Sequence, residues 1–182
     1  MSLNTTDFAS LYQQYKSLVY NVALSYVQNI EDAEEITQDV FIQLHQSIGT
    51  FNNQSSLKTW IYRIVINKSL DFLKHKESQK RFFIFGKRSE NEYEIQNISN
   101  FEHPGILLEN QEKSKMLFQV INELNENQKT AFILSKIDGL SNPEIASIMQ
   151  LTVSSIESLL FRAKDNLKKK LADKFEEYRK KK

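Results

Sequence analysis

Glycine and proline are scarce in this chain, which has 4 Gly and 2 Pro among 182 residues. These two residues most often interrupt regular secondary structure, so the sequence contains few natural breaks and favours long helices. Apolar residues recur at three- and four-residue steps, as in the stretch from Ser56 to Leu73. That spacing places them along one side of a helix. Because β-branched residues do not cluster in period-two runs, the sequence predicts an all-α protein.

Composition argues against several other classes of protein. There is no cysteine, which excludes a disulfide framework and a thiolate metal site. His45, His75 and His103 lie far apart and follow no ligand spacing. No apolar run approaches the length of a membrane span, and the first residues lack the basic and apolar regions of a signal peptide. We therefore expect a cytoplasmic protein without a metal or cofactor.

Charge is distributed in blocks, although the net charge is only +1. Residues 1–73 carry net −3, residues 74–89 net +5, residues 90–161 net −7 and residues 162–182 net +6. Each basic block follows a stretch with helical periodicity. This pattern is typical of a nucleic-acid-binding protein with two basic contact regions and an acidic docking surface.

Two helices are predicted before residue 48. The first runs from Asp7 to Val27, and the second begins after Asn29, a favourable N-cap. The first should bury Phe8, Leu11, Tyr12, Tyr15, Leu18, Val19, Val22, Ala23 and Tyr26; the second should bury Ala33, Ile36, Val40 and Leu44. Asp32, Glu35 and Asp39 share another arc of the second helix, with no bases at the following i+4 positions. This arc is either a solvated face or a docking face for a basic partner.

A polar loop from Ile48 to Ser56 separates the second helix from the third, which Ser55 or Ser56 should cap. Loops rich in Asn and Gln can hydrogen-bond an unstacked base, but they are also common on protein surfaces. The third helix should present two stripes. The core stripe is Leu57, Trp60, Ile61, Ile64, Val65, Lys68 and Phe72; the polar stripe is Thr59, Arg63, Asn67 and Lys74, in which arginine and asparagine suit base or phosphate recognition.

Helical periodicity fails from about Lys76 to Gly105. We interpret residues 76–106 as a flexible linker between an N-terminal helical bundle, residues 1–75, and a second domain, residues 107–182. The linker includes the apolar segment Phe82–Phe85, whose role the sequence does not indicate.

The second domain has the pattern of a helix-turn-helix. Gly139 should end one helix, and Ser141 with Glu144 should form a capping box for the next. Thr152 should cap a final long helix whose buried stripe is Val153, Ile156, Leu160, Ala163, Leu167 and Leu171. In a helix-turn-helix, the start of the last helix enters the major groove. The lysines at 164, 168, 169 and 170 suit phosphates.

Together these motifs resemble the extracytoplasmic function (ECF) sigma factors, the smallest members of the sigma-70 family of bacterial transcription initiation factors. Asp32–Phe41 resembles the segment that docks on the clamp helices of the polymerase β′ subunit. Thr59–Ile64 with Asn67 resembles the segment that captures the melted −10 element. The −35 reader is resembled by Ile137–Ser141 with Glu144–Ala146, then by Ser155–Ile156 and Phe161–Lys164. The order and separation of these motifs make the resemblance specific.

The resemblance implies particular site residues and partners. Polymerase contacts would be made by Asp32, Glu35, Gln38 and Asp39. Contacts to the −10 element would be made by Phe51, Asn52, Asn53, Arg63 and Asn67, and contacts to the −35 element by Ser154, Ser155, Glu157, Ser158, Phe161 and Arg162. The expected partners are core RNA polymerase (the β′ clamp helices and the β subunit), promoter DNA and an anti-sigma factor.

Glu157 departs from the family pattern, because family members often carry a basic residue there and another at the position of Leu159. A glutamate repels phosphate but can accept a hydrogen bond from a cytosine amino group. The −35 sequence therefore cannot be carried over from relatives, and Arg162 with Ser158 are the firmer candidates for DNA contacts.

Two other functions remain open at this point. A conventional helix-turn-helix regulator would bind duplex DNA tightly without polymerase. A metal-dependent nuclease could use paired acids, but no second acidic or histidine-bearing helix faces them by any recognisable spacing. We expect no catalytic activity.

Overall fold

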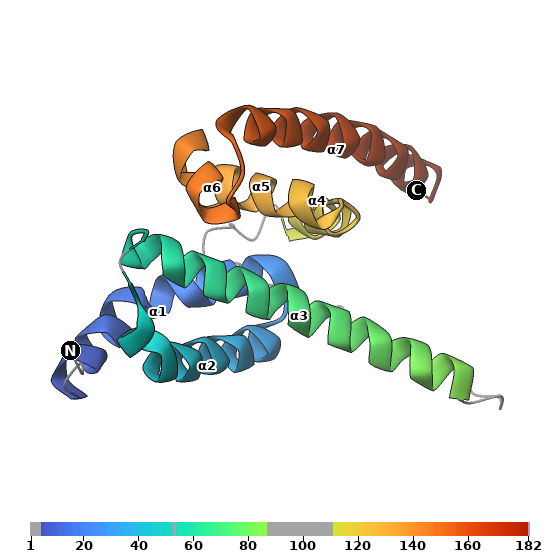
Figure 1. The fold of residues 1–182 in the computed structure, drawn as a ribbon. Coiled ribbons are helices and arrows are strands. Elements are labelled where there is room, and N and C mark those ends of the chain that lie inside the picture. Colours follow the sequence, from blue (N-terminus) through green and yellow to red (C-terminus); the bar gives the residue numbers. More distant parts are fainter. Residues whose placement is uncertain (1–4, 53, 87–110, 182) are drawn as a thin grey trace. The chain divides into compact units, whose positions relative to one another are not determined.

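The computed structural model describes residues 5–52, 54–86 and 111–181 (Figure 1). All regular structure in these ranges is helical, with seven α-helices, one short 3-10 helix and no strand. This confirms the predicted all-α class. The chain divides into two compact units: residues 1–54 with 64–100, and residues 55–63 with 101–182.

The first unit is built from α1 (Thr5–Val27), α2 (Ile30–Ser47) and most of α3 (Leu57–Gly86). Gln28 adopts a left-handed conformation with φ of 55°, which ends α1. The Asn29 side chain then accepts from the Asp32 N–H at 2.7 Å and starts α2, as predicted. A tight two-residue junction thus folds α2 back on α1 (Figure 1).

The core of this unit largely matches the predicted stripes. Ala33, Ile36, Val40 and Leu44 are all buried, and Tyr26 of α1 is fully buried. Tyr12 differs, since it is 40% exposed and lies against the Phe41 ring at 4.6 Å between centroids. In the part of α3 that belongs to this unit the buried arc is wider than predicted: Ile64 and Val65 are buried, but so are Ile66 and Ser69. Ile61 and Tyr62 of α3 are buried as well, and they belong to the second unit.

Helix α3 is longer than the sequence pattern predicted. It begins after Ser56, whose hydroxyl accepts from the Thr59 N–H at 3.0 Å, and it continues to Gly86. The interpretation of residues 76–86 as part of a flexible linker is therefore wrong. The rest of the predicted linker, residues 87–106, lies outside the described residues, so the bounds of the two domains stay a prediction.

The second unit contains α4 (Gln111–Asn122), α5 (Glu126–Lys136), α6 (Asn142–Met149) and α7 (Val153–Lys181). Gly139, with φ of 69°, forms the turn after α5. Glu144 accepts from the Ser141 backbone N–H at 2.9 Å, which is the carboxylate half of the predicted capping box. Thr152 accepts from the Ser155 N–H at 3.1 Å and caps α7.

Helix α7 packs on α4, α5 and α6 through a narrow apolar stripe. Ile156, Ala163 and Leu167 are buried as predicted, and so are Ile145 of α6 and Leu134 of α5. Val153, in contrast, is 40% exposed at the start of α7. The tight turn between α6 and α7 confirms the helix-turn-helix and leaves the opposite side of α7 open to a ligand.

Candidate nucleic-acid and protein interfaces

The acidic face of α2 is partly neutralised by bases from α3. Lys76 is paired with Asp32 at 2.5 Å, and Lys68 lies 3.8 Å from Asp39. Asp32 therefore has a partner within the chain, and its side chain is only 18% exposed. The i+4 rule could not reveal these pairs because it covers partners on the same helix only.

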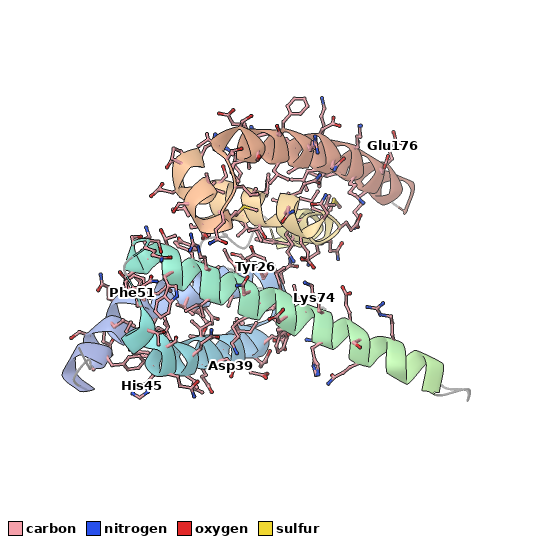
Figure 2. All side chains as sticks on the ribbon, in the orientation of Figure 1. Tyr26, Asp39, His45, Phe51, Lys74 and Glu176 are labelled. Carbon is pink, nitrogen blue, oxygen red and sulfur yellow. The ribbon has the colours of Figure 1, made fainter. Side chains whose placement is uncertain are left out.

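The remainder of this face is open to solvent. Glu35, Gln38 and Asp39 are exposed, and Glu31 and Glu34 add negative charge beside them. Figure 2 shows Asp39 on α2. An exposed acidic helix face held by a buried apolar stripe can bind a basic protein surface.

The loop after α2 offers a half-buried aromatic side chain and exposed polar groups. Phe51 follows the 3-10 turn Ile48–Thr50 and is half-buried (Figure 2). Asn52 is exposed, and its side-chain oxygen accepts from the Gln54 N–H at 3.4 Å. Asn53 lies outside the described residues. Asn67 is exposed on α3, so its amide is available to an unpaired base.

Arg63 uses part of its guanidinium within the second unit. Its Nη2 donates to the Ser147 carbonyl oxygen at 2.6 Å, and its Nε donates to the Ile148 carbonyl oxygen at 3.2 Å. These carbonyls belong to the last turn of α6, where a positive charge is favoured by the helix dipole. Arginine has five N–H donors, so other donors remain for a further partner.

Asp138, at the end of α5, is a buried acid that the sequence pattern did not single out as a site. Burial raises its pKa from 3.8 to about 7, and Lys58 partly opposes this rise. Its Oδ2 atom is buried without a hydrogen-bond partner among the described residues. Burial, with Asp138 and Glu144 nearby, also raises the pKa of Tyr62.

The predicted DNA-reading residues occupy the outer side of α7 near its start. Ser154, Glu157, Ser158, Phe161 and Arg162 are exposed. Ser155 is the exception, because it is half-buried and its hydroxyl shares a 2.8 Å hydrogen bond with Thr152. Phe161 is 75% exposed, the highest value among the large apolar side chains of the described residues.

The basic run on α7 divides into free and engaged lysines. Lys164 and Lys168 are exposed, while Lys169 lies 2.9 Å from Asp165. Lys170 donates to Glu123 at 2.6 Å and Lys174 lies 3.0 Å from the same carboxylate. Hydrogen bonds from both lysines hold the pKa of Glu123 below its usual value. Lys170 thus ties α7 to the residue after α4, and its expected contact with DNA phosphates stays a prediction.

Neither a metal centre nor a membrane span stands out in the part of the chain that the structure describes. No group of three or more His, Cys, Asp or Glu side chains there could hold a metal ion. No described helix is long and apolar enough to cross a bilayer.

Comparison with known proteins gives the same two-part organisation. Residues 11–79 match sigma-70 region 2 and residues 114–167 match sigma-70 region 4. The chain is 29% identical over 166 residues to the ECF RNA polymerase sigma-E factor of Haemophilus influenzae, covering 90% of this chain and 87% of the relative. It is 27% identical over 174 residues to the RNA polymerase sigma-H factor of Pseudomonas aeruginosa, covering 90% and 86%.

A solved structure shares the fold. The sigma factor RpoE from Bartonella quintana, crystallised with the anti-sigma factor NepR, matches with a TM-score of 0.68 and 21% identity, over 92% of this chain and 98% of that one. The two region matches, in the family's order and on a confirmed helix-turn-helix, establish that the chain belongs to the ECF group of the sigma-70 family.

Proposed function

We propose that the chain binds core RNA polymerase through the exposed acidic face of α2 and positions it on promoters through α3, the loop before it, and α7. As a member of the sigma-70 family, the chain is a transcription initiation factor that directs polymerase to promoters. The observation that carries the assignment of surfaces is their coincidence with the two matched regions: the acidic face lies within residues 11–79, and the open face of α7 lies within residues 114–167.

The polymerase-binding surface centres on Glu35, Gln38 and Asp39. All three are exposed on one helix that buried residues hold firmly in place. Asp32 is assigned a supporting role, because its pair with Lys76 fastens α2 to α3. We place the basic partner on the clamp helices of the β′ subunit, with further contacts to the β subunit.

The −10 surface comprises Phe51, Asn52, Asn53, Arg63 and Asn67. A half-buried aromatic can stack on a base, and asparagine amides can pair with its edge. Flipping a base out of the duplex costs a few kcal/mol, which stacking and polymerase binding would have to offset. Arg63 contributes through the donors that its two α6 contacts leave unused.

The −35 surface is the outer side of α7, at Ser154, Glu157, Ser158, Phe161 and Arg162. Ser155 supports it by joining the Thr152 cap. Lys164 and Lys168 are the exposed cations that can contact phosphates further along the groove.

Transcription with purified components tests the function. Core polymerase and a promoter library should yield transcripts only when the chain is added. Asp39→Lys should lower the affinity for core, whereas the same change at Asp173, an exposed acid of α7, should not. No binding to core, together with no transcript from any promoter, would contradict the proposal. If the chain binds duplex DNA tightly and Asp39→Lys does not change that affinity, a conventional regulator is favoured.

We also infer an anti-sigma partner and a non-catalytic role. The structurally similar RpoE of Bartonella quintana was solved with an anti-sigma factor, and a protein that covers the faces of α2 or α7 would keep this chain inactive. The chemistry of RNA synthesis resides in the polymerase, so the chain acts by binding alone. Since promoter DNA is its target, we place it in the cytoplasm.

A further inference from the structure

The outer face of α7 carries two side chains that do not suit a surface made only for phosphates. Glu157 is a carboxylate within the DNA-reading segment, and Phe161 leaves 75% of its surface in water. None of the ion pairs in the described part of the chain involves Glu157. Both residues are held in place from behind, because Ile156 and Ala163 are fully buried.

We propose that Glu157 and Phe161 determine the sequence of the −35 element by selecting a cytosine and a neighbouring thymine. This inference rests on the proposed function, in which this face enters the major groove. Glu157 accepts a hydrogen bond from the cytosine N4 amino group, and the Phe161 ring packs on the thymine methyl group.

The chemistry of the groove edges supports these assignments. In the major groove cytosine presents an amino donor, whereas guanine presents only the N7 and O6 acceptors. A carboxylate, which only accepts, therefore favours cytosine over guanine, which repels it, and over adenine, whose amino group lies beside the N7 acceptor. The thymine methyl is the one apolar group on these edges, and aromatic side chains are suited to contact it.

The helix geometry sets the distance between the two bases. Glu157 and Phe161 are four residues apart, so they lie on one side of α7 about 6 Å apart along its axis. Successive base pairs are spaced by 3.4 Å. The selected cytosine and thymine should therefore lie within one or two base pairs of each other.

Charge explains how an acid is tolerated here. Arg162, Lys164 and Lys168 are exposed on the same helix and supply attraction to phosphates that does not depend on sequence. The negative charge of Glu157 weakens the attraction to DNA at every site. Only where the carboxylate accepts a hydrogen bond from a base amino group is this loss of binding free energy compensated. The pair thus trades non-specific affinity for base selection.

A selection experiment on the full-length chain tests this. A promoter library randomised across the −35 element is transcribed with core polymerase, and a duplex library is bound by the chain alone as a second arm. Variants Glu157→Gln and Phe161→Ala are compared with Glu176→Gln and Phe175→Ala, which alter the same residue types near the far end of α7. Figure 2 labels Glu176.

The wild type should enrich cytosine at one position and thymine within two base pairs of it. Glu157→Gln should reduce the cytosine preference about tenfold at that position alone, and Phe161→Ala should weaken only the thymine preference. Replacing that thymine with deoxyuridine, which lacks the methyl group, should weaken the wild type and leave Phe161→Ala unchanged. The Glu176 and Phe175 variants should match the wild type.

Two results would overturn the inference. In the first, the Glu157 and Phe161 variants have the same base preferences as the wild type. In the second, Glu157→Gln binds all sequences more tightly by the same factor. Either can occur while the chain still supports transcription, so the sigma function would stand. Conversely, a cytosine preference in the duplex arm that Glu157→Gln removes would support the inference even if no transcript formed, and only the sigma function would then fail.

Discussion

Replacing Asp138 with asparagine should make the protein more stable at neutral and alkaline pH. The asparagine has nearly the same shape and cannot ionise. In the wild type, burial raises the pKa of the Asp138 carboxyl from 3.8 to about 7. An ionised Asp138 is thus disfavoured by the folded state, and its Oδ2 atom has no hydrogen-bond partner among the described residues to compensate.

The sign follows from proton binding in the two states. The folded state holds the proton more tightly than the unfolded state, so the contribution of Asp138 to the free energy of unfolding is greatest below about pH 4. It falls as the pH rises to about 7 and is then level. The pKa difference of about 3, at 1.36 kcal/mol per pKa unit, sets an upper limit of about 4 kcal/mol. The partial exposure of Asp138 reduces the expected loss to about 2 kcal/mol.

Urea denaturation from pH 4.5 to 8.5 measures this. Trp60 is the only tryptophan of the chain and belongs to the same compact unit as Asp138, so its fluorescence reports the relevant transition. The free energy of unfolding of Asp138→Asn minus that of the wild type should rise by about 2 kcal/mol over this range. Taking the difference cancels the titration of other groups. Asp173→Asn, at an exposed site, is the control, and its difference should stay flat. A flat difference for Asp138→Asn as well would refute the argument.

Changes at three further positions probe the fold and the interfaces. Ile156→Ala should lower the free energy of unfolding by about 2–5 kcal/mol, and Ile156→Val by about 1 kcal/mol, in urea denaturation, because this side chain is fully buried. Thr152→Ala should lower it by about 1 kcal/mol by removing the acceptor for the Ser155 N–H; no loss would mean that the cap does not contribute. Asp39→Lys should leave the melting temperature within a few degrees, since its pair with Lys68 is exposed and long, yet weaken core binding at least tenfold in a pull-down titration.

Local chemistry predicted the helix ends and much of the core. Asn29, Ser56 and Thr152 each accept from a backbone N–H three residues on, and such caps depend on a few neighbouring residues only. Buried stripes on α2 and α7 followed from the 3.6-residue period. These features can be predicted from the sequence because the residues that cause them lie within one or two helical turns of each other.

Features that depend on distant residues or on weak propensity could not be predicted. Asp32 and Lys76 are 44 residues apart, and Glu123 meets Lys170 across 47. The continuation of α3 to Gly86 was missed because charged residues replace the apolar period beyond Lys76. Lysine, glutamate, glutamine and arginine are nonetheless good helix formers, so a polar sequence does not imply an unfolded one.

The ion pairs between α2 and α3 alter what polymerase binding must accomplish. A basic partner of the acidic face competes with Lys68 for Asp39, at 3.8 Å and exposed, and with Lys76 for Asp32, which is close and mostly covered. The first pair costs little to break, because exposed ion pairs contribute about 1 kcal/mol or less. Breaking the second pair costs more, because the partly buried carboxylate of Asp32 would then need a new cationic partner. In the proposed mode of binding the partner would therefore gain most from Glu35, Gln38 and Asp39, and Asp32 would serve it best by staying paired and holding α2 in place on α3.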